Sequence, residues 1–150
     1  MTHLDLRSCS RLRDLAGVDA MPGLSELVLH DCPRLGTLRG LGPQRRLDQL
    51  EIKGCSEPAD LSAVSALTHL KKLTVEGAER LTSLRGVDAL GFLKSVRLAD
   101  YPGLQDFSTL TQLSALHRLA LQGLGQLHDL SSFAAVSGLE SLHIMAATGW

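Results

Sequence analysis

Apolar residues recur along this chain at a fixed interval of 23 residues. When each unit is numbered from its first apolar residue, the pattern is LxxLxLxxCxxLxxLxxLxxLxx, and all 32 leucines fall in its eight apolar columns. Only Gln44 and Pro58 interrupt those columns. Such a period predicts a repeat protein in which each unit forms one turn of a solenoid. The first position of successive units is held by Met1, Leu24, Leu47, Leu70, Leu93, Leu116 and Leu139.

Two shorter periods inside each unit predict two backbone shapes. Positions 4 and 6 alternate with polar residues, as in Leu27 and Leu29, which is the period of a strand with one buried face over positions 3 to 7. Positions 12, 15, 18 and 21 are apolar every third residue, which is typical of a 3₁₀ or short helical return. Position 14 always holds a side chain that accepts hydrogen bonds from a helix start, so the return is expected to begin there: Asp14, Thr37, Asp60, Ser83, Asp106 and Asp129.

Stacked units can bury the apolar stripe that a single unit leaves exposed. The strands should therefore align as a parallel sheet with the returns behind it, and the connections should be right-handed. The predicted fold class is α/β, a right-handed solenoid with a parallel β-sheet on the concave face and short 3₁₀ or helical returns on the convex face. One domain is expected over 1–150, with units at 1–23, 24–46, 47–69, 70–92, 93–115 and 116–138 and a partial unit at 139–150.

The LxxLxL blocks at 24–29, 47–52, 70–75, 93–98, 116–121 and 139–144 resemble those of the leucine-rich-repeat family along the entire chain. The segments DCPRL at 31–35 and GCSEP at 54–58 resemble the C-terminal repeats of nucleotide-binding immune receptors of plants and of the bacterial NACHT type. The family usually places asparagine at position 9, whereas this column begins with Cys9, Cys32 and Cys55. The turn after each strand must therefore satisfy its backbone in another way.

Composition and charge restrict the partners that we expect. The chain is 44% apolar and 21% charged with a net charge of −1, which gives no electrostatic reason to expect nucleic acid or an anionic membrane. No apolar run reaches 18 residues, and the start of the sequence lacks the basic and apolar regions of a signal peptide. We therefore expect a protein partner, no nucleic acid, no membrane and a cytoplasmic location.

Catalysis and metal binding are not expected. Cysteines one repeat apart should point inward on neighbouring strands and run parallel, whereas a disulfide needs side chains directed at each other and zinc needs four converging ligands. Cys32 follows His30 and Asp31, but position 7 should face outward and position 9 inward, which separates a thiol from its base. The segment at 40–43 lacks the lysine of a phosphate-binding loop. The sequence predicts no enzyme, no metal and no cofactor.

The exposed side chains at positions 3, 5, 7 and 8 are the candidate binding surface. Because a parallel sheet normally has both faces covered, an open one favours recognition of a partner, although the same side chains could be no more than a solvated face. Lys72, Arg97 and Arg118 should form a basic group, with Lys71 and Lys94 at its margin, and the two arginines are the expected anchors. The predicted partner-binding residues are Arg7, His30, Glu51, Lys53, Lys72, Thr74, Arg97, Arg118 and His143.

Both ends of the sequence lack the polar cap that a solenoid needs. The chain is therefore expected to be a segment of a larger receptor, or else its copies stack end to end. The leading hypothesis is a protein-binding or ligand-sensing module that serves as the recognition segment of a larger cytosolic receptor. The alternative is a stand-alone scaffold or adaptor with no attached switch, and a catalytic role would need a domain outside this chain.

Overall fold

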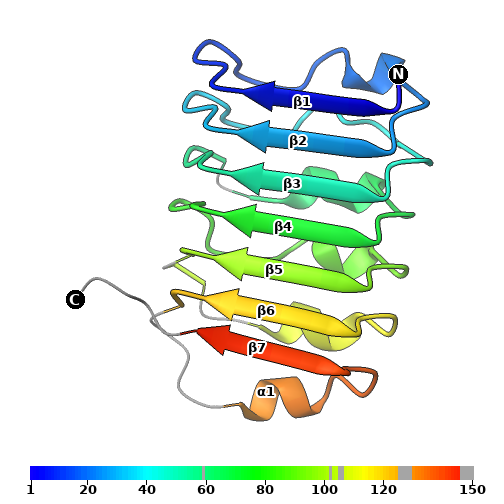
Figure 1. Ribbon diagram of the computed structural model, residues 1–150, viewed down its shortest axis with the longest axis vertical. Helices are drawn as coiled ribbons and strands as arrows, with labels where there is room; N and C mark the ends of the chain where they lie inside the picture. The colour runs from blue at the N-terminus through cyan, green and yellow to red at the C-terminus, as the bar shows by residue number, and fades with distance from the viewer. Residues whose placement is uncertain (59, 102, 105–106, 125–129, 146–150) are drawn as a thin grey trace.

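Seven parallel strands form one sheet in the order of the sequence (Figure 1). The computed structural model describes residues 1–58, 60–101, 103–104, 107–124 and 130–145. Each strand occupies positions 3 to 7 of its unit, so the strands predicted from the apolar alternation are confirmed. Their bounds are β1 His3–Arg7, β2 Glu26–His30, β3 Gln49–Lys53, β4 Lys72–Glu76, β5 Ser95–Ala99, β6 Arg118–Gln122 and β7 Ser141–Met145.

The register of the sheet equals the sequence period. Every strand residue pairs with the residue 23 positions later, as in Leu4 with Leu27 and Glu51 with Thr74. Each sequence column therefore becomes a row of side chains that runs across the sheet. The chain passes from each strand behind the sheet to the next strand, in the right-handed sense that was predicted.

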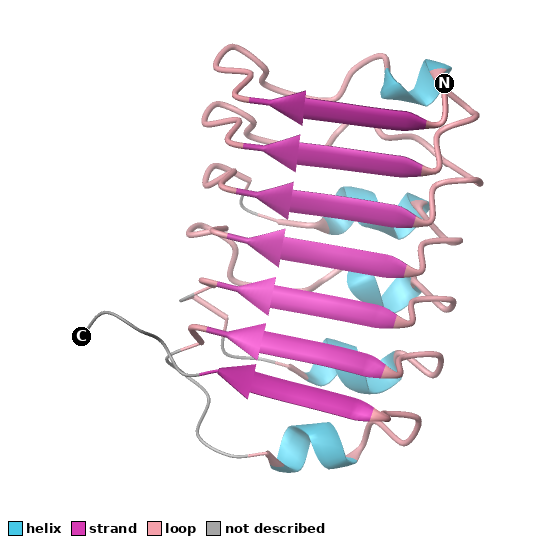
Figure 2. Cartoon of the chain, in the orientation of Figure 1, coloured by secondary structure: helices cyan, strands magenta, loops and turns pink. Residues whose placement is uncertain are grey.

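The returns behind the sheet contain short helices (Figure 2). Unit 24–46 is described throughout and contains no helix. The helices begin at position 16 or 18 of the other complete units, so the prediction that they begin at position 14 was wrong. They are η1 Val18–Ala20, η2 Ser62–Ala66, η3 Val87–Ala89, η4 Ser108–Gln112 and α1 Ser131–Ala134.

In the four units where it is described, position 14 instead closes a local turn. Oδ1 of Asp14 accepts a hydrogen bond from the N–H of Ala16 at 3.0 Å, and Oγ of Ser83 accepts one from Arg85 at the same distance. Thr37 and Asp60 accept equivalent bonds from the residue two positions later. These side-chain turns compete with helical hydrogen bonding, which postpones the helix. Asp106 and Asp129 lie outside the described residues.

Position 17 determines where the helix begins. Gly17 and Gly86 have φ angles of 100° and 102°, and the helix starts only at the next residue. An L side chain rarely adopts this conformation, so glycine is required there. In unit 24–46 Gly40 has the same geometry, and Pro43 follows soon after. The three units with a longer helix have a residue other than glycine at this position, namely Ala63, Thr109 and Ser132.

The core lies between the sheet and the returns. Its leucines are almost completely buried, and each fully buried leucine contributes roughly 1.5–3 kcal/mol to folding before the loss of chain entropy. Both residues that interrupt the apolar columns are also buried: Pro58, and Gln44 at 3% exposure. Nε2 of Gln44 donates to the carbonyl oxygens of Val18 at 2.7 Å and Leu41 at 3.1 Å. The amide thereby ties two successive returns together.

The outer strands are less covered than the inner ones. On β7, Leu142 and Ile144 are each 38% exposed, whereas Leu119 and Leu121 at the same positions of β6 are 2% and 1% exposed. Among the described helices and strands, β6 is the one element in contact with β7. No helix in the described part of the chain is long and apolar enough to cross a membrane.

Candidate functional site: the open face of the sheet

The open face is the side of the sheet opposite the returns, formed by positions 3, 5 and 7 of β1 to β7. No described helix packs on this face (Figure 2). Position 8 was expected to belong to it, and the structure corrects this. Ser8, Asp31 and Asp100 there have φ angles of 52–54°, and Gly54 and Gly77 have 67° and 68°. After β1 to β6, position 8 is thus a left-handed turn residue that ends the strand, and all nine predicted binding residues lie on positions 3, 5 and 7.

An ion-pair ladder crosses the middle of the open face. Nε2 of His30 donates to Oε1 of Glu51 at 2.7 Å, and Nζ of Lys53 lies 3.1 Å from the same oxygen. Lys53 also lies 3.7 Å from Glu76, which accepts a hydrogen bond from Nε of Arg97 at 2.7 Å. The ladder continues from Arg97 to Oε1 of Gln122 at 3.3 Å. It therefore joins five strands, and it consists of His30, Glu51, Lys53, Glu76, Arg97 and Gln122.

The environment of Glu51 keeps the ladder charged. Partial burial alone would raise the pKa of the Glu51 carboxyl, but the hydrogen bonds and positive charge from His30 and Lys53 outweigh it and lower the pKa below its ordinary value. Glu51 is therefore ionised at neutral pH, and its carboxylate holds its neighbours in fixed positions.

Four of the predicted binding residues, His30, Glu51, Lys53 and Arg97, are thus members of this ladder. Arg97 in particular has its guanidinium engaged by Glu76 and Gln122, so the charge of this one member of the expected basic group is neutralised. Arg7 pairs within its own strand with Asp5 at 2.8 Å. Such preformed pairs can still bind a ligand, but only one that matches their alternating charges.

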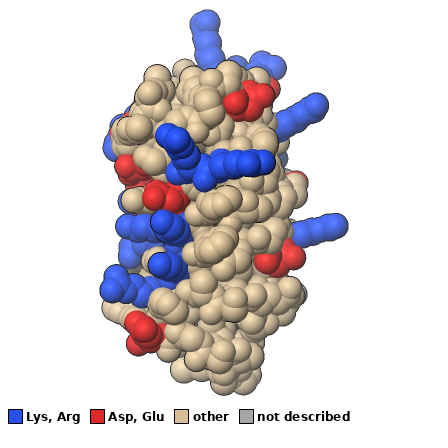
Figure 3. Space-filling model, turned by 90° about the vertical axis from the view of Figure 1, so that its right-hand side faces the viewer, with Lys and Arg blue, Asp and Glu red and all other residues tan. Residues whose placement is uncertain are grey.

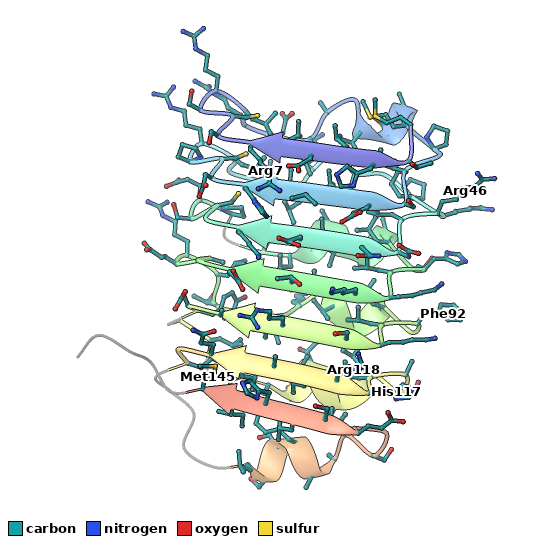
Figure 4. The ribbon with its side chains drawn as sticks, in the orientation of Figure 1. Arg7, Arg46, Phe92, His117, Arg118 and Met145 are labelled. Carbon is teal, nitrogen blue, oxygen red and sulfur yellow. The ribbon has the colours of Figure 1, made fainter. Side chains whose placement is uncertain are left out.

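The remaining predicted residues differ in accessibility. Thr74 stands between the longer side chains of Glu51 and Arg97 in its row and is only 5% exposed, so it contributes little surface. Lys72 and Arg118 are exposed, and neither makes an ion pair with a described residue. Figure 4 shows Arg118 on β6, toward the edge of the sheet where the strands begin. His143 is exposed on β7.

The cysteine column belongs to the core. Cys32 and Cys55 are 0% exposed, which confirms the prediction for these two, and all three cysteines are free. Sγ of Cys32 donates to the carbonyl oxygens of His30 at 3.4 Å and Leu6 at 3.7 Å, and Cys55 repeats the arrangement one unit later. At Cys32 and Cys55, weak thiol hydrogen bonds to strand carbonyls take the place of those from the asparagine that the leucine-rich-repeat family usually has at position 9.

His30 is not placed to act as a base for the Cys32 thiol. The His30 ring bonds to Glu51 on the open face, while the thiol lies on the buried side. Burial raises the pKa of the Cys32 thiol and raises that of Cys55 to about 11, which disfavours the reactive thiolate. Within the described residues, no group of three or more histidine, cysteine, aspartate or glutamate side chains could hold a metal ion.

Comparison with solved structures identifies the fold. The structure of internalin C2 from Listeria monocytogenes matches with a TM-score of 0.84 and 23% sequence identity over 97% of this chain and 62% of that one. The fold is a leucine-rich-repeat solenoid. Two other leucine-rich-repeat structures also match. Internalin InlF from Listeria monocytogenes has a TM-score of 0.56 and 18% sequence identity over 87% of this chain and 44% of that one. The TLR13–ssRNA13 complex has a TM-score of 0.60 and 23% sequence identity over 97% of this chain and 25% of that one.

These likenesses establish the leucine-rich-repeat fold and no more. No family model matches the sequence, and no curated protein matches it. This chain spans 62% of the internalin C2 structure and 25% of the TLR13 structure. Since TLR13 is in complex with ssRNA13, the fold gives no ground for the expectation that nucleic acid is excluded.

One exposed residue was missed by the sequence-based reasoning. Phe92 is 57% exposed, and its ring stacks on that of His69 with centroids 5.7 Å apart and planes 9° from parallel. The sequence did indicate that Phe92 differs from the other aromatic residues. The others that are described all stand in apolar columns and are buried, namely Tyr101, Phe107 and Phe133. Phe92 stands at position 23, outside those columns, and an aromatic residue outside the core pattern indicates an exposed site.

Proposed function

We propose that this solenoid is a non-enzymatic binding module that holds a protein ligand against the open face of its sheet. The observation that carries the proposal is the uncovered face itself. Parallel sheets are normally covered on both sides, and a solenoid that leaves one face open presents an extended binding surface.

The ion-pair ladder supports recognition by that face. Its charged groups are held by each other before a ligand arrives, so a ligand with a complementary order of acidic and basic groups loses less entropy on binding. The ladder presents positive groups at Lys53 and Arg97 and negative groups at Glu51 and Glu76. The proposed binding surface also includes Arg7, His30, Lys72, Arg118 and His143.

A finer proposal is that the module is the recognition segment of a larger cytosolic receptor. The DCPRL and GCSEP segments support it through their resemblance to the C-terminal repeats of nucleotide-binding immune receptors. The alternative is a stand-alone scaffold or adaptor. A switch domain encoded in the same or a neighbouring reading frame favours the receptor, and its absence from the native gene favours the adaptor.

Paired arginine substitutions on opposite sides of the solenoid test the binding proposal. Gln49→Arg with Ala120→Arg places two bulky cations on the open face, where Gln49 is exposed and Ala120 half-buried. Ser65→Arg with Ala134→Arg makes the same change in charge on exposed positions of the returns. Affinity capture from the native host should recover the same proteins with wild type and the return variant, and should lose them with the open-face variant. Equal recovery by all three would exclude the open face as the binding site.

A further inference from the structure

A row of free cations lies along the edge of the solenoid where the strands begin. This basic edge extends over repeats 2 to 6, on the loops that lead into the strands and on the first strand residues. Each of its cations is exposed, and none makes an ion pair with a described residue. They make up six of the 15 lysines and arginines of the chain, and they are Arg45, Arg46, Lys71, Lys72, Lys94 and Arg118.

The basic edge differs from the open face in how its charges are balanced. On the open face, Lys53 and Arg97 are neutralised by glutamates within 4 Å. Beside its six cations lie the carboxylates Glu26, Asp48 and, from repeat 7, Glu140, and Glu26 is already bonded to His3 at 2.9 Å. Figure 3 faces this edge and shows the basic side chains gathered in groups, with acidic patches beside them. The edge therefore keeps an uncompensated positive charge that the net charge of −1 conceals.

An exposed aromatic platform lies within the same edge. His69 and Phe92 occupy position 23 of successive repeats, each two residues before a cation of the edge, Lys71 and Lys94. The leucines between them, Leu70 and Leu93, are fully buried, so the flanking side chains extend outward. The nearly parallel stack covers one side of the Phe92 ring and leaves the ring 57% exposed. Figure 4 shows Arg46, Phe92 and His117 along this edge.

A shallow depression adjoins the platform on the side of β6. It has a volume of about 250 Å³ and is lined by Lys94, Ser95, His117, Arg118 and Glu140. Nδ1 of His117 donates to the carbonyl oxygen of Gly138 at 3.1 Å, which fixes the ring orientation in its wall. Lys94 and Arg118 bring two positive charges to its lining against the one carboxylate of Glu140, so the balance of these charges favours an anionic group.

We propose that the basic edge binds a single-stranded nucleic acid, with Phe92 stacking on a base and the lysines contacting phosphates. Proteins that bind single strands without sequence preference combine these two elements, a line of positive charge and an aromatic face, because every base has a flat π-surface. An acidic peptide satisfies the cations but has no flat group at regular intervals for the platform. The site shares Lys72 and Arg118 with the open face, extends from it onto the loops that lead into the strands, and goes beyond the proposed function.

Fluorescence anisotropy with a labelled single strand of about 20 nucleotides, longer than the ~4–16 nucleotides that one such groove covers, tests the proposal. Wild type should bind it with an affinity that falls steeply between about 50 and 200 mM salt. Lys71→Gln with Lys94→Gln should weaken binding and reduce the slope of log K against log salt by about 1.4, since each phosphate contact on a single strand contributes about 0.7. The matched control Arg39→Gln with Arg85→Gln removes two exposed cations from the returns and should leave both unchanged.

Phe92→Ala separates base stacking from simple charge attraction. Loss of one stacked base should reduce affinity roughly fivefold or more, with the salt slope unchanged, because no phosphate contact is lost. Because the ring is exposed, this variant should stay folded, and equal thermal midpoints of variant and wild type would establish that. The proposal is overturned if wild type shows no salt-dependent binding, if Phe92→Ala binds as wild type, or if polyglutamate of equal charge competes as well as the oligonucleotide.

Discussion

The cysteine at position 9 performs two tasks in one small side chain. At Cys32 and Cys55 the thiol fills the space beneath the turn and donates weakly to carbonyl oxygens of its own and the preceding strand. A thiol is a poor donor but packs as a small apolar group. In repeat 5 the same column holds Tyr101, whose ring is fully buried and whose hydroxyl donates to the carbonyl oxygen of Ser83 at 3.1 Å. The column thus accepts a large aromatic residue as well as a small thiol, and both donate to a carbonyl oxygen.

Thiol labelling should distinguish the three cysteines. At about pH 8, near the ordinary pKa of a free thiol, iodoacetamide should modify Cys9 first, because it is only half-buried. Cys32 and Cys55 should react far more slowly in the folded protein, since burial blocks access and raises the pKa of each thiol, to about 11 for Cys55. In denaturant all three should react at similar rates. Mass spectrometry of labelled peptides measures this, and labelling of Cys55 as fast as Cys9 in the folded state would contradict it.

At the scale of the element, the returns differ from one another more than the strands do. All seven strands occupy the same five positions of their units. The helices differ in where they begin and in length, according to the residue at position 17, and unit 24–46 has no helix. The close approach of successive returns adds a second constraint. A Cβ on Gly86 would lie 2.7 Å from the carbonyl oxygen of Leu61 and 2.9 Å from Cα of Ser62.

Alanine substitutions at two nearby glycines should therefore have different effects. Gly86→Ala combines an unfavourable φ of 102° with that steric conflict and should lower the free energy of unfolding by roughly 1–3 kcal/mol. Gly91→Ala has open space around the added Cβ and no positive φ, so it should change stability by less than about 0.5 kcal/mol. Urea unfolding measures both. Gly17→Ala, with a φ of 100° but no close neighbour, should lie between them.

The ion-pair ladder makes the stability of the folded protein depend on pH. Because the pKa of Glu51 is lowered in the folded state, its contribution to stability is complete above the ordinary value of 4.5 and is lost as the pH falls through the lowered value. Glu51→Gln should cost on the order of 0.5–1 kcal/mol at neutral pH and should make stability less sensitive to acid below about pH 4.5. Urea unfolding over this pH range measures the difference.

The control for this measurement is Glu79→Gln. Glu79 is exposed and makes no ion pair with a described residue, so this variant should follow the wild-type pH profile. If Glu51→Gln and Glu79→Gln behave alike, the ladder does not stabilise the sheet.

At the scale of the whole molecule, two surfaces of different character lie side by side. On the open face, charges are neutralised by their neighbours, whereas on the basic edge they are not. The net charge of −1 sums all charged residues of the chain and so hides this difference, which is why composition gave no reason to expect a polyanion. The oligonucleotide and capture experiments address these surfaces separately: Phe92→Ala should leave protein capture on the open face intact.

Particular residues show how far the sequence could predict these surfaces. The 23-residue period placed His30, Glu51 and Arg97 on one face, since position 5 and position 7 alternate outward in a strand. It did not predict that His30 would bond to Glu51, or Glu76 to Arg97. Each pair is 21 residues apart, because position 7 of one strand meets position 5 of the next along a diagonal. Such pairing depends on side-chain conformation, which a column pattern does not specify.

The sequence by itself determined the solenoid: its period, the limits of its strands and the columns that form the core, because burial of apolar side chains repeats wherever the backbone repeats. Only the tertiary structure decided where the helices begin, which charges are neutralised and which stay free. Those outcomes depend on local turns such as the one at position 14, and on contacts between neighbouring repeats such as the approach of Gly86 to Leu61 and the stacking of Phe92 on His69. A period fixes which residues become neighbours, but the conformations of their side chains determine how they interact.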